Sequence, residues 1–278
     1  MKIGRFDIEP LSEGHFLIHE DGRMEKSVWN PSETDEPFLN RSLVVGIEPM
    51  LLMDDTHVVL LDAGIGMGLD AGSPAPGVSN LKTNLEIFGL SPADVTHVVL
   101  SHLHLDHSAG LSYTDRGGST ISTLPNARIL VQQREWDHAL AQFDAPNPYQ
   151  DAGYAIDDLL RLKASGQLEG IRQDSLEVIP GVSLVFTGGH TPGHQIVRIA
   201  DSGKTAYFMG DLLPNEEFFQ PKVRHRIDSD ALVAARIKRL MLRQIYRENA
   251  YILMYHSLFS RVGRLARHPM GNFGLNDD

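Results

Sequence analysis

Short aliphatic runs recur along the chain and are separated by turns rich in glycine, proline, asparagine and aspartate. Runs of this length, bounded by such residues, are typical of buried β-strands. We predict strands at residues 43–47, 57–61, 95–100, 127–131, 176–179, 182–187, 196–199, 204–209 and 251–255. Helical spacing of apolar positions predicts helices at residues 82–88, 134–143, 155–164 and 228–248, the last amphipathic. Its expected apolar face consists of Val233, Ile237, Leu240, Met241 and Ile245.

Four of the predicted strands lead, within one to three residues, to a side chain that can bind a metal. A turn or loop follows each of these side chains at once. These side chains are His102, His190, Asp211 and His256. Functional groups at the ends of several strands suit an active site, because a sheet fixes their positions. Taken singly, a histidine or a Gly-Asp turn is weak evidence, but together these positions predict one site.

The first of these strands leads into Ser101-His102-Leu103-His104-Leu105-Asp106-His107, with four metal-competent side chains within six residues. Such a cluster is costly to bury without partners, and metal ions supply partners for all of its members. In extended backbone His102 and His104 project to the same side. Asp62 ends another predicted strand, and its position alone allows either a turn residue or a carboxylate that orients a ligand histidine.

The chain has 278 residues, 42% of them hydrophobic, and contains no cysteine. We see no linker or internal repeat and therefore predict a single domain over residues 1–278. We also expect a cytoplasmic protein, because no secretory signal and no apolar run near the about 18 residues of a membrane span is visible. Without thiolates, any metal must be held by nitrogen and oxygen.

The net charge of −11 argues against a nucleic-acid partner. Eleven of the 25 Lys and Arg residues nevertheless lie at positions 222–267. We interpret this concentration as the solvated side of the long helix and its flanks; the alternative is an electropositive rim that attracts anionic substrates.

The sequence resembles the metallo-β-lactamase superfamily over about residues 44–265. The resemblance rests on His102-x-His104-x-Asp106-His107, Gly189-His190-Thr191-Pro192-Gly193-His194, Gly210-Asp211 and His256. It implies an αββα sandwich of two mixed β-sheets flanked by helices. In that family's pattern His102, His104 and His190 would hold one metal; Asp106, His107 and His256 would hold another; Asp211 would bridge both. Asp62 would support a ligand histidine, and His194 would be a structural histidine.

The resemblance therefore implies a hydrolase with two divalent ions. Two ions about 3.5–4 Å apart can share a hydroxide that attacks an ester, because metals lower the pKa of water to about 7. By the same resemblance Asp106 would orient the nucleophile and pass a proton to the leaving oxygen. Zinc is the expected ion, although imidazole and carboxylate ligands also suit Mn²⁺, Co²⁺ and Fe²⁺.

Within that family the chain most resembles N-acyl-homoserine lactone lactonases (quorum-quenching enzymes) and methyl parathion hydrolase. One departure is Pro214, which stands where the best-known lactonases carry a tyrosine. Carbonyl polarisation would then fall to the metals or to another group such as Tyr255. Phe218 and Phe219 are candidate walls for an acyl chain, or else they pack the loop against the core.

Three functions remain open at this stage: a lactonase, a phosphotriesterase or phosphodiesterase of the same fold, and a non-catalytic protein that binds a small signal. The resemblance also favours a homodimer. Residues 112–125 and 141–153 are candidate lid segments by their position in the chain.

Overall fold

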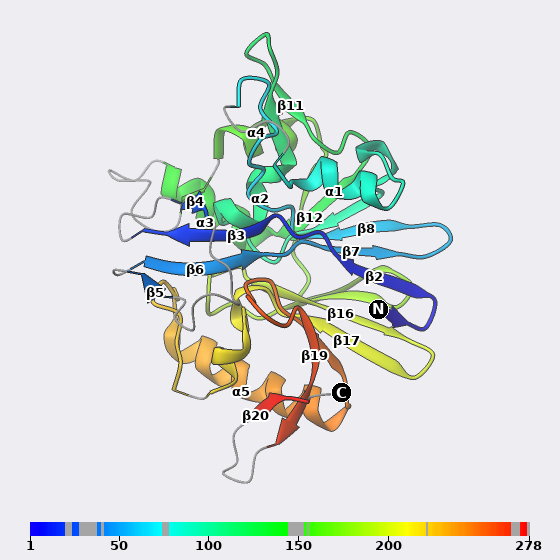
Figure 1. The fold of residues 1–278 in the computed structure, drawn as a ribbon, viewed down its shortest axis with the longest axis vertical. Helices are drawn as coiled ribbons and strands as arrows, with labels where there is room; N and C mark the ends of the chain where they lie inside the picture. The colour runs from blue at the N-terminus through cyan, green and yellow to red at the C-terminus, as the bar shows by residue number, and fades with distance from the viewer. Residues whose placement is uncertain are drawn as a thin grey trace.

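A computed structural model describes residues 1–19, 24–27, 38–39, 42–73, 78–143, 153–154, 156–220, 222–267 and 273–276. Its described parts form four layers, with two β-sheets packed face to face and helices covering their outer faces (Figure 1). The αββα sandwich expected from the sequence is confirmed.

The first sheet mixes antiparallel and parallel strands. In spatial order it contains β1 (Lys2–Ile3), β2 (Phe6–Pro10), β7 (Met50–Met53), β8 (Val58–Leu61), β9 (His97–Val99), β12 (Arg128–Gln132) and β13 (Leu168–Ile171). β8, β9, β12 and β13 run parallel to one another, whereas β1, β2, β7 and β8 are joined by antiparallel pairs. Parallel strands end at one edge of a sheet, so the segments after β8 and β9 emerge together.

The second sheet is antiparallel except where β17 pairs parallel with β18. Its order is β14 (Ser175–Ile179), β15 (Val182–Phe186), β16 (Gln195–Asp201), β17 (Lys204–Phe208), β18 (Tyr251–Leu253), β19 (Val262–Arg267) and β20 (Phe273–Leu275). The parallel pair has the same consequence here, since the residues after β17 and β18 also leave the sheet side by side.

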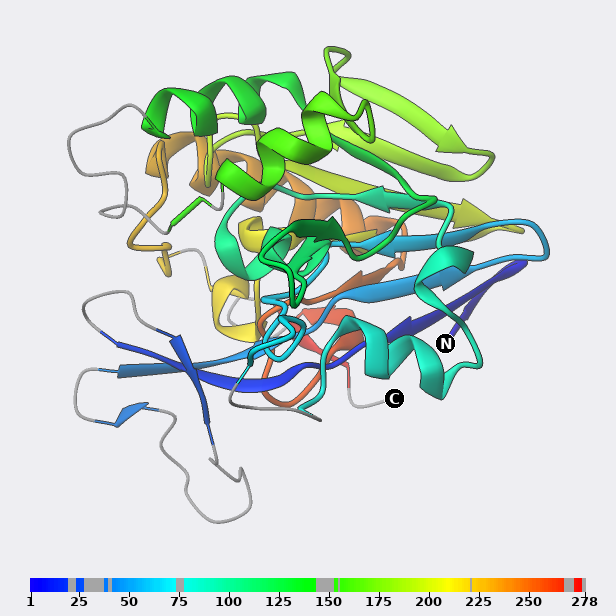
Figure 2. The same ribbon diagram turned by 90° about the horizontal axis from the view of Figure 1, so that it is seen from above.

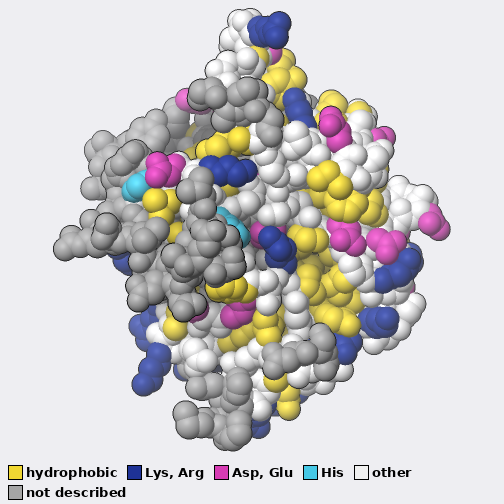
Figure 3. Space-filling model, in the orientation of Figure 1, with side chains coloured by type: hydrophobic (Ala, Val, Ile, Leu, Met, Phe, Trp, Pro, Cys, Tyr) yellow, Lys and Arg dark blue, Asp and Glu magenta, His cyan; other side chains and the backbone are white. Residues whose placement is uncertain are grey.

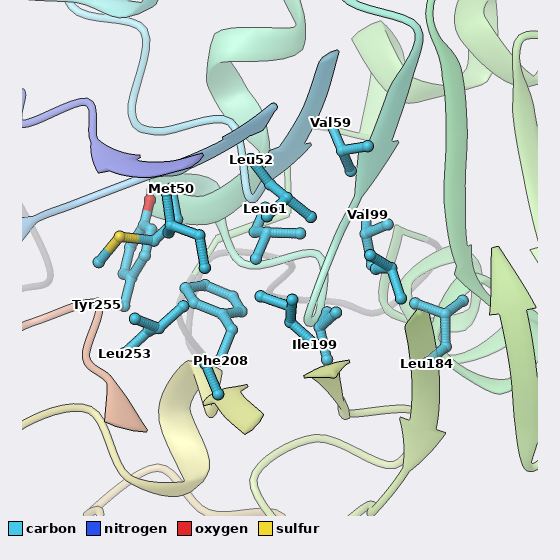
Figure 4. Packing of buried hydrophobic residues seen from close by; sticks show 14 of the residues in the cluster. Met50, Leu52, Val59, Leu61, Val99, Leu184, Ile199, Phe208, Leu253 and Tyr255 are labelled. Carbon is cyan, nitrogen blue, oxygen red and sulfur yellow. The ribbon is translucent and has the colours of Figure 1, made fainter. Parts of the chain in front are cut away.

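Alternating side chains fill the space between the sheets and the outer layers. Leu52, Leu61 and Val99 face Leu184, Ile199, Phe208 and Leu253 in the central core (Figure 4). Their sequence neighbours Leu51, Leu60 and Val98 belong instead to the core under the helices of the first sheet. Since successive strand residues point to opposite faces, this apolar run on both faces is what a sheet covered on both sides requires.

The helices begin at identifiable caps. The helices are α1 (Leu81–Ile87), α2 (Leu105–Ser108), α3 (Gln133–Phe143), α4 (Ile156–Ala164) and α5 (Ala231–Arg247), with 3₁₀ turns at Pro92–Asp94, Ala109–Leu111, Gly210–Leu212 and Glu216–Phe219. The side chain of Asn80 accepts from the amides of Lys82 and Thr83 at the start of α1. Asp230 does the same for α5 through Leu232 and Val233. These bonds satisfy amide groups that the helix itself leaves unpaired.

The predicted apolar face of α5 is partly wrong. Val233 and Leu240 are 38% and 50% exposed, and the buried positions are Ala234, Lys238, Met241, Leu242 and Ile245. The buried face is rotated by about one residue and includes Lys238, which turns inward to donate to the backbone carbonyls of Gln220 and Val223. A hydropathy pattern assigns lysine to the solvent side and therefore misplaces the face.

A smaller sheet extends from the sandwich (Figure 2). It contains β4 (Met24–Lys26), β3 (Gly14–Ile18), β6 (Ser42–Ile47) and β5 (Phe38–Leu39). Of the candidate lid segments, residues 112–125 include the hairpin β10 (Ser112–Thr114) and β11 (Thr120–Ser122). In the other, residues 144–152 lie outside the described residues.

In the part of the chain that the structure describes, no helix combines the length and the apolar character needed to cross a bilayer. On the face drawn in Figure 3, acidic and basic side chains are interspersed.

Candidate metal centre

The ends of four strands bring the predicted site residues together. β9, β15, β17 and β18 end at Val99, Phe186, Phe208 and Leu253, each three or four residues before one of them. Seven side chains gather there in two groups, and the ligand atoms within each group lie within 4.8 Å of one another. The groups are His102, His104, His190 and Asp211, and Asp106, His107 and His256.

The first group is a tight cluster of ring nitrogens. His104 Nδ1 lies 2.9 Å from His102 Nε2 and 3.2 Å from His190 Nε2. Two nitrogens bound to one tetrahedral metal at about 2.0–2.1 Å would be about 3.3 Å apart. The spacing of these imidazoles therefore suits a shared metal ion.

Asp211 belongs to the first group and also borders the second, with one carboxylate oxygen toward each. Its Oδ1 is 3.3 Å from His107 Nε2 and 3.2 Å from His256 Nε2. Its Oδ2 is 3.4 Å from His190 Nε2. Asp106 Oδ2 completes the second group at 3.3 Å from His256 Nε2 and 3.7 Å from His107 Nε2. A carboxylate in this position can contact a cation in either group.

The second ring nitrogen of several of these histidines is already engaged. Nδ1 of His107 lies 2.7 Å from Asp62 Oδ2, Nδ1 of His190 lies 3.0 Å from Asp228 Oδ1, and Nδ1 of His256 lies 2.8 Å from the Gly46 carbonyl oxygen. A histidine that donates from Nδ1 presents the lone pair of Nε2, and this is how proteins orient metal-binding imidazoles.

Burial sets the pKa of some of these groups, and charged neighbours set the pKa of others. It is the main cause that lowers the pKa of His102 and His104 well below the ordinary value, and that of His190 to about 3. Burial also opposes the charged forms of His107 and Asp211, but their neighbours outweigh it. Carboxylates raise the pKa of His107 well above its ordinary value, and histidines lower that of Asp211 well below its own.

The donor set fits divalent metal ions. His107 Nε2 and Asp211 Oδ1 are buried and have no hydrogen-bond partner. Buried polar atoms are rarely left unpaired, and each such atom costs about 1–3 kcal/mol. Both atoms face the space between the two groups, so a cation there would satisfy them. Nitrogen and oxygen ligands of this kind suit zinc and its first-row neighbours.

Glu135, which the sequence analysis did not single out, joins the two ligand-bearing loops. Its oxygens accept from the amide of Leu103 at 3.0 Å and from the amide of Gly193 at 3.1 Å. It is fully buried on α3, and burial raises the pKa of its carboxyl. His194 lies behind the first group, with Nδ1 2.7 Å from Thr187 Oγ1 and its ring 5.5 Å from that of His102.

Two glycines allow the loops to approach the site closely. Gly210, with φ +49°, precedes Asp211, and a Cβ there would lie 2.7 Å from Ser101 Cβ and 2.8 Å from His194 Nε2. Gly189, with φ +91°, precedes His190, and a Cβ there would lie 2.7 Å from the Ala234 backbone. Only glycine adopts such angles at little cost and leaves this space free.

The remaining predicted residues occupy different environments. Phe218 lines a narrow pocket next to Asp211, whereas Phe219 is buried in the core under α5. Tyr255 is fully buried, stacks on His107 and donates from its hydroxyl to the Asp106 carbonyl oxygen at 2.6 Å. Its hydroxyl therefore supports the backbone of Asp106. The Pro214 carbonyl oxygen accepts from the amide of His256 at 2.8 Å.

Comparison with known proteins agrees with this fold. The family model of the metallo-beta-lactamase superfamily matches residues 44–244, so the chain belongs to this superfamily. It is 36% identical to the N-acyl homoserine lactonase AttM of Azorhizobium caulinodans over 124 residues. The aligned stretch covers 43% of this chain and 42% of that protein. The chain thus aligns with about two fifths of the length of this curated relative.

Two solved structures match nearly the whole chain. A probable metal-dependent hydrolase from Staphylococcus aureus is 25% identical with a TM-score of 0.76, covering 100% of this chain and 99% of that one. AidC, a dizinc quorum-quenching lactonase, is 20% identical with a TM-score of 0.75, covering 100% and 96%. At that identity the likeness to AidC supports the fold alone.

Proposed function

We propose that this protein is a metal-dependent hydrolase that opens the ring of N-acyl homoserine lactones. The observation that carries the proposal is the position of Asp211, whose two oxygens face the two ligand groups at 3.2–3.4 Å. A site of this form suits two cations that act on one ester. The relatives named N-acyl homoserine lactonase favour a lactone over other esters.

The ligand assignment follows the two groups. His102, His104 and His190 would hold one ion, Asp106, His107 and His256 the other, and Asp211 would contact both. Zinc is the expected ion, with Mn²⁺, Co²⁺ and Fe²⁺ as alternatives. Asp62 and His194 would keep the ligands in place through their contacts with His107 and the Thr187 loop.

Bound ions would lower the pKa of water and polarise the substrate carbonyl. Asp106 is the ligand-group residue that reaches furthest toward solvent, with 17% of its side chain exposed. We assign it the proton of the attacking water. The water oxygen adds to the carbonyl carbon, the ring C–O bond breaks, and the proton passes to the leaving ring oxygen, giving a hydroxy acid.

Turnover of a homoserine lactone series, measured together with metal content, tests this proposal. The metal-loaded protein should hold two ions per chain and hydrolyse lactones faster than paraoxon or bis-(4-nitrophenyl) phosphate. Dominant turnover of a phosphorus ester would identify a phosphotriesterase or phosphodiesterase instead. Metal-loaded protein that is inert on every ester but binds a lactone would identify the signal-binding alternative.

Three further predictions accompany this function: a cytoplasmic location, a single domain over residues 1–278, and a homodimer. Sedimentation of the purified protein would test the last of them.

A further inference from the structure

An eighth side chain reaches the centre from a loop that the sequence analysis did not single out. His225 Nε2 lies 3.7 Å from Asp211 Oδ2, and its ring is 4.9 Å from that of His190. The side chain of His225 is 23% exposed, whereas those of His190 and Asp211 are 0% and 4% exposed. It therefore stands between these two buried side chains and solvent.

Hydrogen bonds from the start of α5 hold the loop of His225 against the ligand turn. The amides of Ser229 and Asp230 donate to the carbonyl oxygens of His190 and Gly189 at 2.8 and 2.9 Å. Asp228 Oδ1 lies 3.0 Å from Nδ1 of His190. The segment just after His225 thus keeps a fixed position relative to a ligand of the first group.

Lys238 fixes the other side of the same loop. Its side chain is buried, and its Nζ donates to the carbonyl oxygens of Val223 and Gln220. Burying an ammonium is costly unless it is hydrogen-bonded. Lys238 therefore needs these two carbonyls, and its contacts with them hold the loop against α5. With the loop held on both sides of His225, the imidazole is positioned in advance at the rim of the site.

The surroundings of His225 combine apolar and charged side chains. A small pocket beside Asp211 is lined by His225 itself, by apolar and by charged side chains: Leu212, Phe218, Val223 and Ala234, and Arg224, Asp228 and Lys238. The ring of Phe218 lies 5.4 Å from that of His225. The pocket's volume of about 10 Å³ leaves no room for an acyl chain, so the imidazole would meet only the ester group.

We propose that His225 is a catalytic residue whose Nε2–H donates a hydrogen bond to the carbonyl oxygen of the scissile ester. This inference rests on the proposed function and deepens it. Pro214 offers no side-chain donor, and the hydroxyl of Tyr255 is bound to Asp106. His225 supplies the missing donor. Its bond strengthens as negative charge develops on the oxygen, so it stabilises the transition state more than the bound substrate.

His225→Ala, His225→Gln and Arg226→Ala test the proposal in the metal-loaded full chain. Arg226 is exposed on the same loop and serves as the control. Removal of one such donor should lower kcat about 100- to 1,000-fold while KM changes by only a few-fold. Glutamine keeps an N–H donor and should recover at least about tenfold of the loss. Metal content and melting temperature should match the wild type in all three variants.

Several results would overturn the proposal. Loss of a metal ion in His225→Ala would make His225 a ligand, and an effect on KM alone would make it a ground-state contact. An unchanged kcat, or an equal loss in Arg226→Ala, would also refute it. Failure of glutamine to recover activity at full metal content would exclude the hydrogen bond.

Lys238→Met provides an independent variant that leaves His225 in place. Because it releases the loop, it should lower kcat at unchanged metal content. The double variant with His225→Ala should lose little more than His225→Ala alone, since both act through one group. Losses that multiply would contradict a positioning role for Lys238 through His225.

The choice of substrate separates this inference from the proposed function. If the wild type hydrolyses 4-nitrophenyl acetate but no lactone, the lactonase proposal fails, and the His225 variants are then compared on that ester. If the wild type hydrolyses neither, both proposals fail.

Discussion

His107 and Asp62 form a fully buried pair, with Nδ1 of the histidine 2.7 Å from Oδ2 of the aspartate. Asp62 adopts φ +57° and also accepts from the backbone amide of Ser101 at 2.6 Å. One carboxylate thus connects the end of β8, the segment after β9 and a proposed ligand. Its hydrogen bond directs Nε2 of His107 toward Asp211.

Asp62→Asn should weaken the second metal group. An amide cannot accept from both Ser101 and His107 as the carboxylate does, so the imidazole loses its orientation. Loss of such a supporting contact typically lowers metal affinity about 10- to 100-fold. Competition with a chelator measures this, and exposed Asp55→Asn is the matched control. Equal affinities in Asp62→Asn and the wild type would contradict the role assigned to Asp62.

Asp211→Asn should abolish simultaneous binding of two ions. The amide keeps one oxygen and places an NH₂ group toward either the His107 side or the His190 side, where a cation cannot be accepted. We expect at least one metal to be lost per chain and hydrolysis to fall by more than about 100-fold. Elemental analysis and initial rates are the measurements. Full metal content with wild-type turnover would refute a role for Asp211 in both groups.

Removal of metal should lower the melting temperature, because ions that bind only the folded state stabilise it. Without them, His107 Nε2 and Asp211 Oδ1 stay buried with no hydrogen-bond partner. Reloading with Zn²⁺, Mn²⁺, Co²⁺ or Fe²⁺ should restore both melting temperature and turnover, and the ion that restores most identifies the preferred metal. Identical melting curves before and after chelation would count against a metal site.

The convergence of the seven side chains was predictable because each follows an aliphatic run or belongs to the His-x-His-x-Asp-His cluster. Hydrophobic runs mark strand interiors, and the strands carry their successors to one edge. Apart from Asp62, which also follows an aliphatic run, the supporting partners have no such signal. Gly46 lies 210 residues from His256, and Asp228 lies 38 residues from His190, so only the folded chain shows these pairs.

His225 and Lys238 show why sequence patterns fail for other parts of the site. His225 stands between Arg224 and Arg226 and therefore resembles a solvated basic segment. Lys238 lies in an amphipathic helix, where lysine normally marks the exposed face, yet its ammonium is turned inward by two backbone carbonyls. Both roles depend on a loop conformation that local hydropathy does not encode.

Glu135→Ala should destabilise the fold and loosen both ligand loops. It leaves the buried amides of Leu103 and Gly193 without acceptors, at about 1–3 kcal/mol each. We expect a loss of about 2–4 kcal/mol in the free energy of unfolding, measured by urea denaturation. Glu135→Gln keeps one acceptor and should lose less. Exposed Glu86→Gln is the control, and a loss in Glu135→Ala no larger than in this control would exclude the bracing role.

Glu13 should make the stability depend on pH. The residue is fully buried near the Gly64–Gly66 turn, accepts from the amides of Ile65 and Gly66, and has Lys26 as its charged neighbour. Burial is the main cause that raises its pKa from 4.5 to about 7, against the opposing effect of these amides and of Lys26. Below pH 4.5 the carboxyl is protonated in both the folded and the unfolded chain, and its contribution is fully present. As pH rises from 4.5 toward 7, the carboxyl ionises in the unfolded chain before it ionises in the folded one. The free energy of unfolding therefore falls over this range.

Glu13→Gln removes this titration while its amide oxygen can still accept from Ile65 and Gly66. The variant should therefore gain stability relative to the wild type between pH 5 and pH 8, by up to an order of 3 kcal/mol. Any cost of the buried NH₂ group is the same at every pH and cancels in the comparison, as does the titration of the metal-site histidines. Urea denaturation of both proteins at several pH values measures the difference. A difference that stays constant across this range would show that Glu13 is ionised in the folded protein throughout, and that the Ile65 and Gly66 amides outweigh its burial.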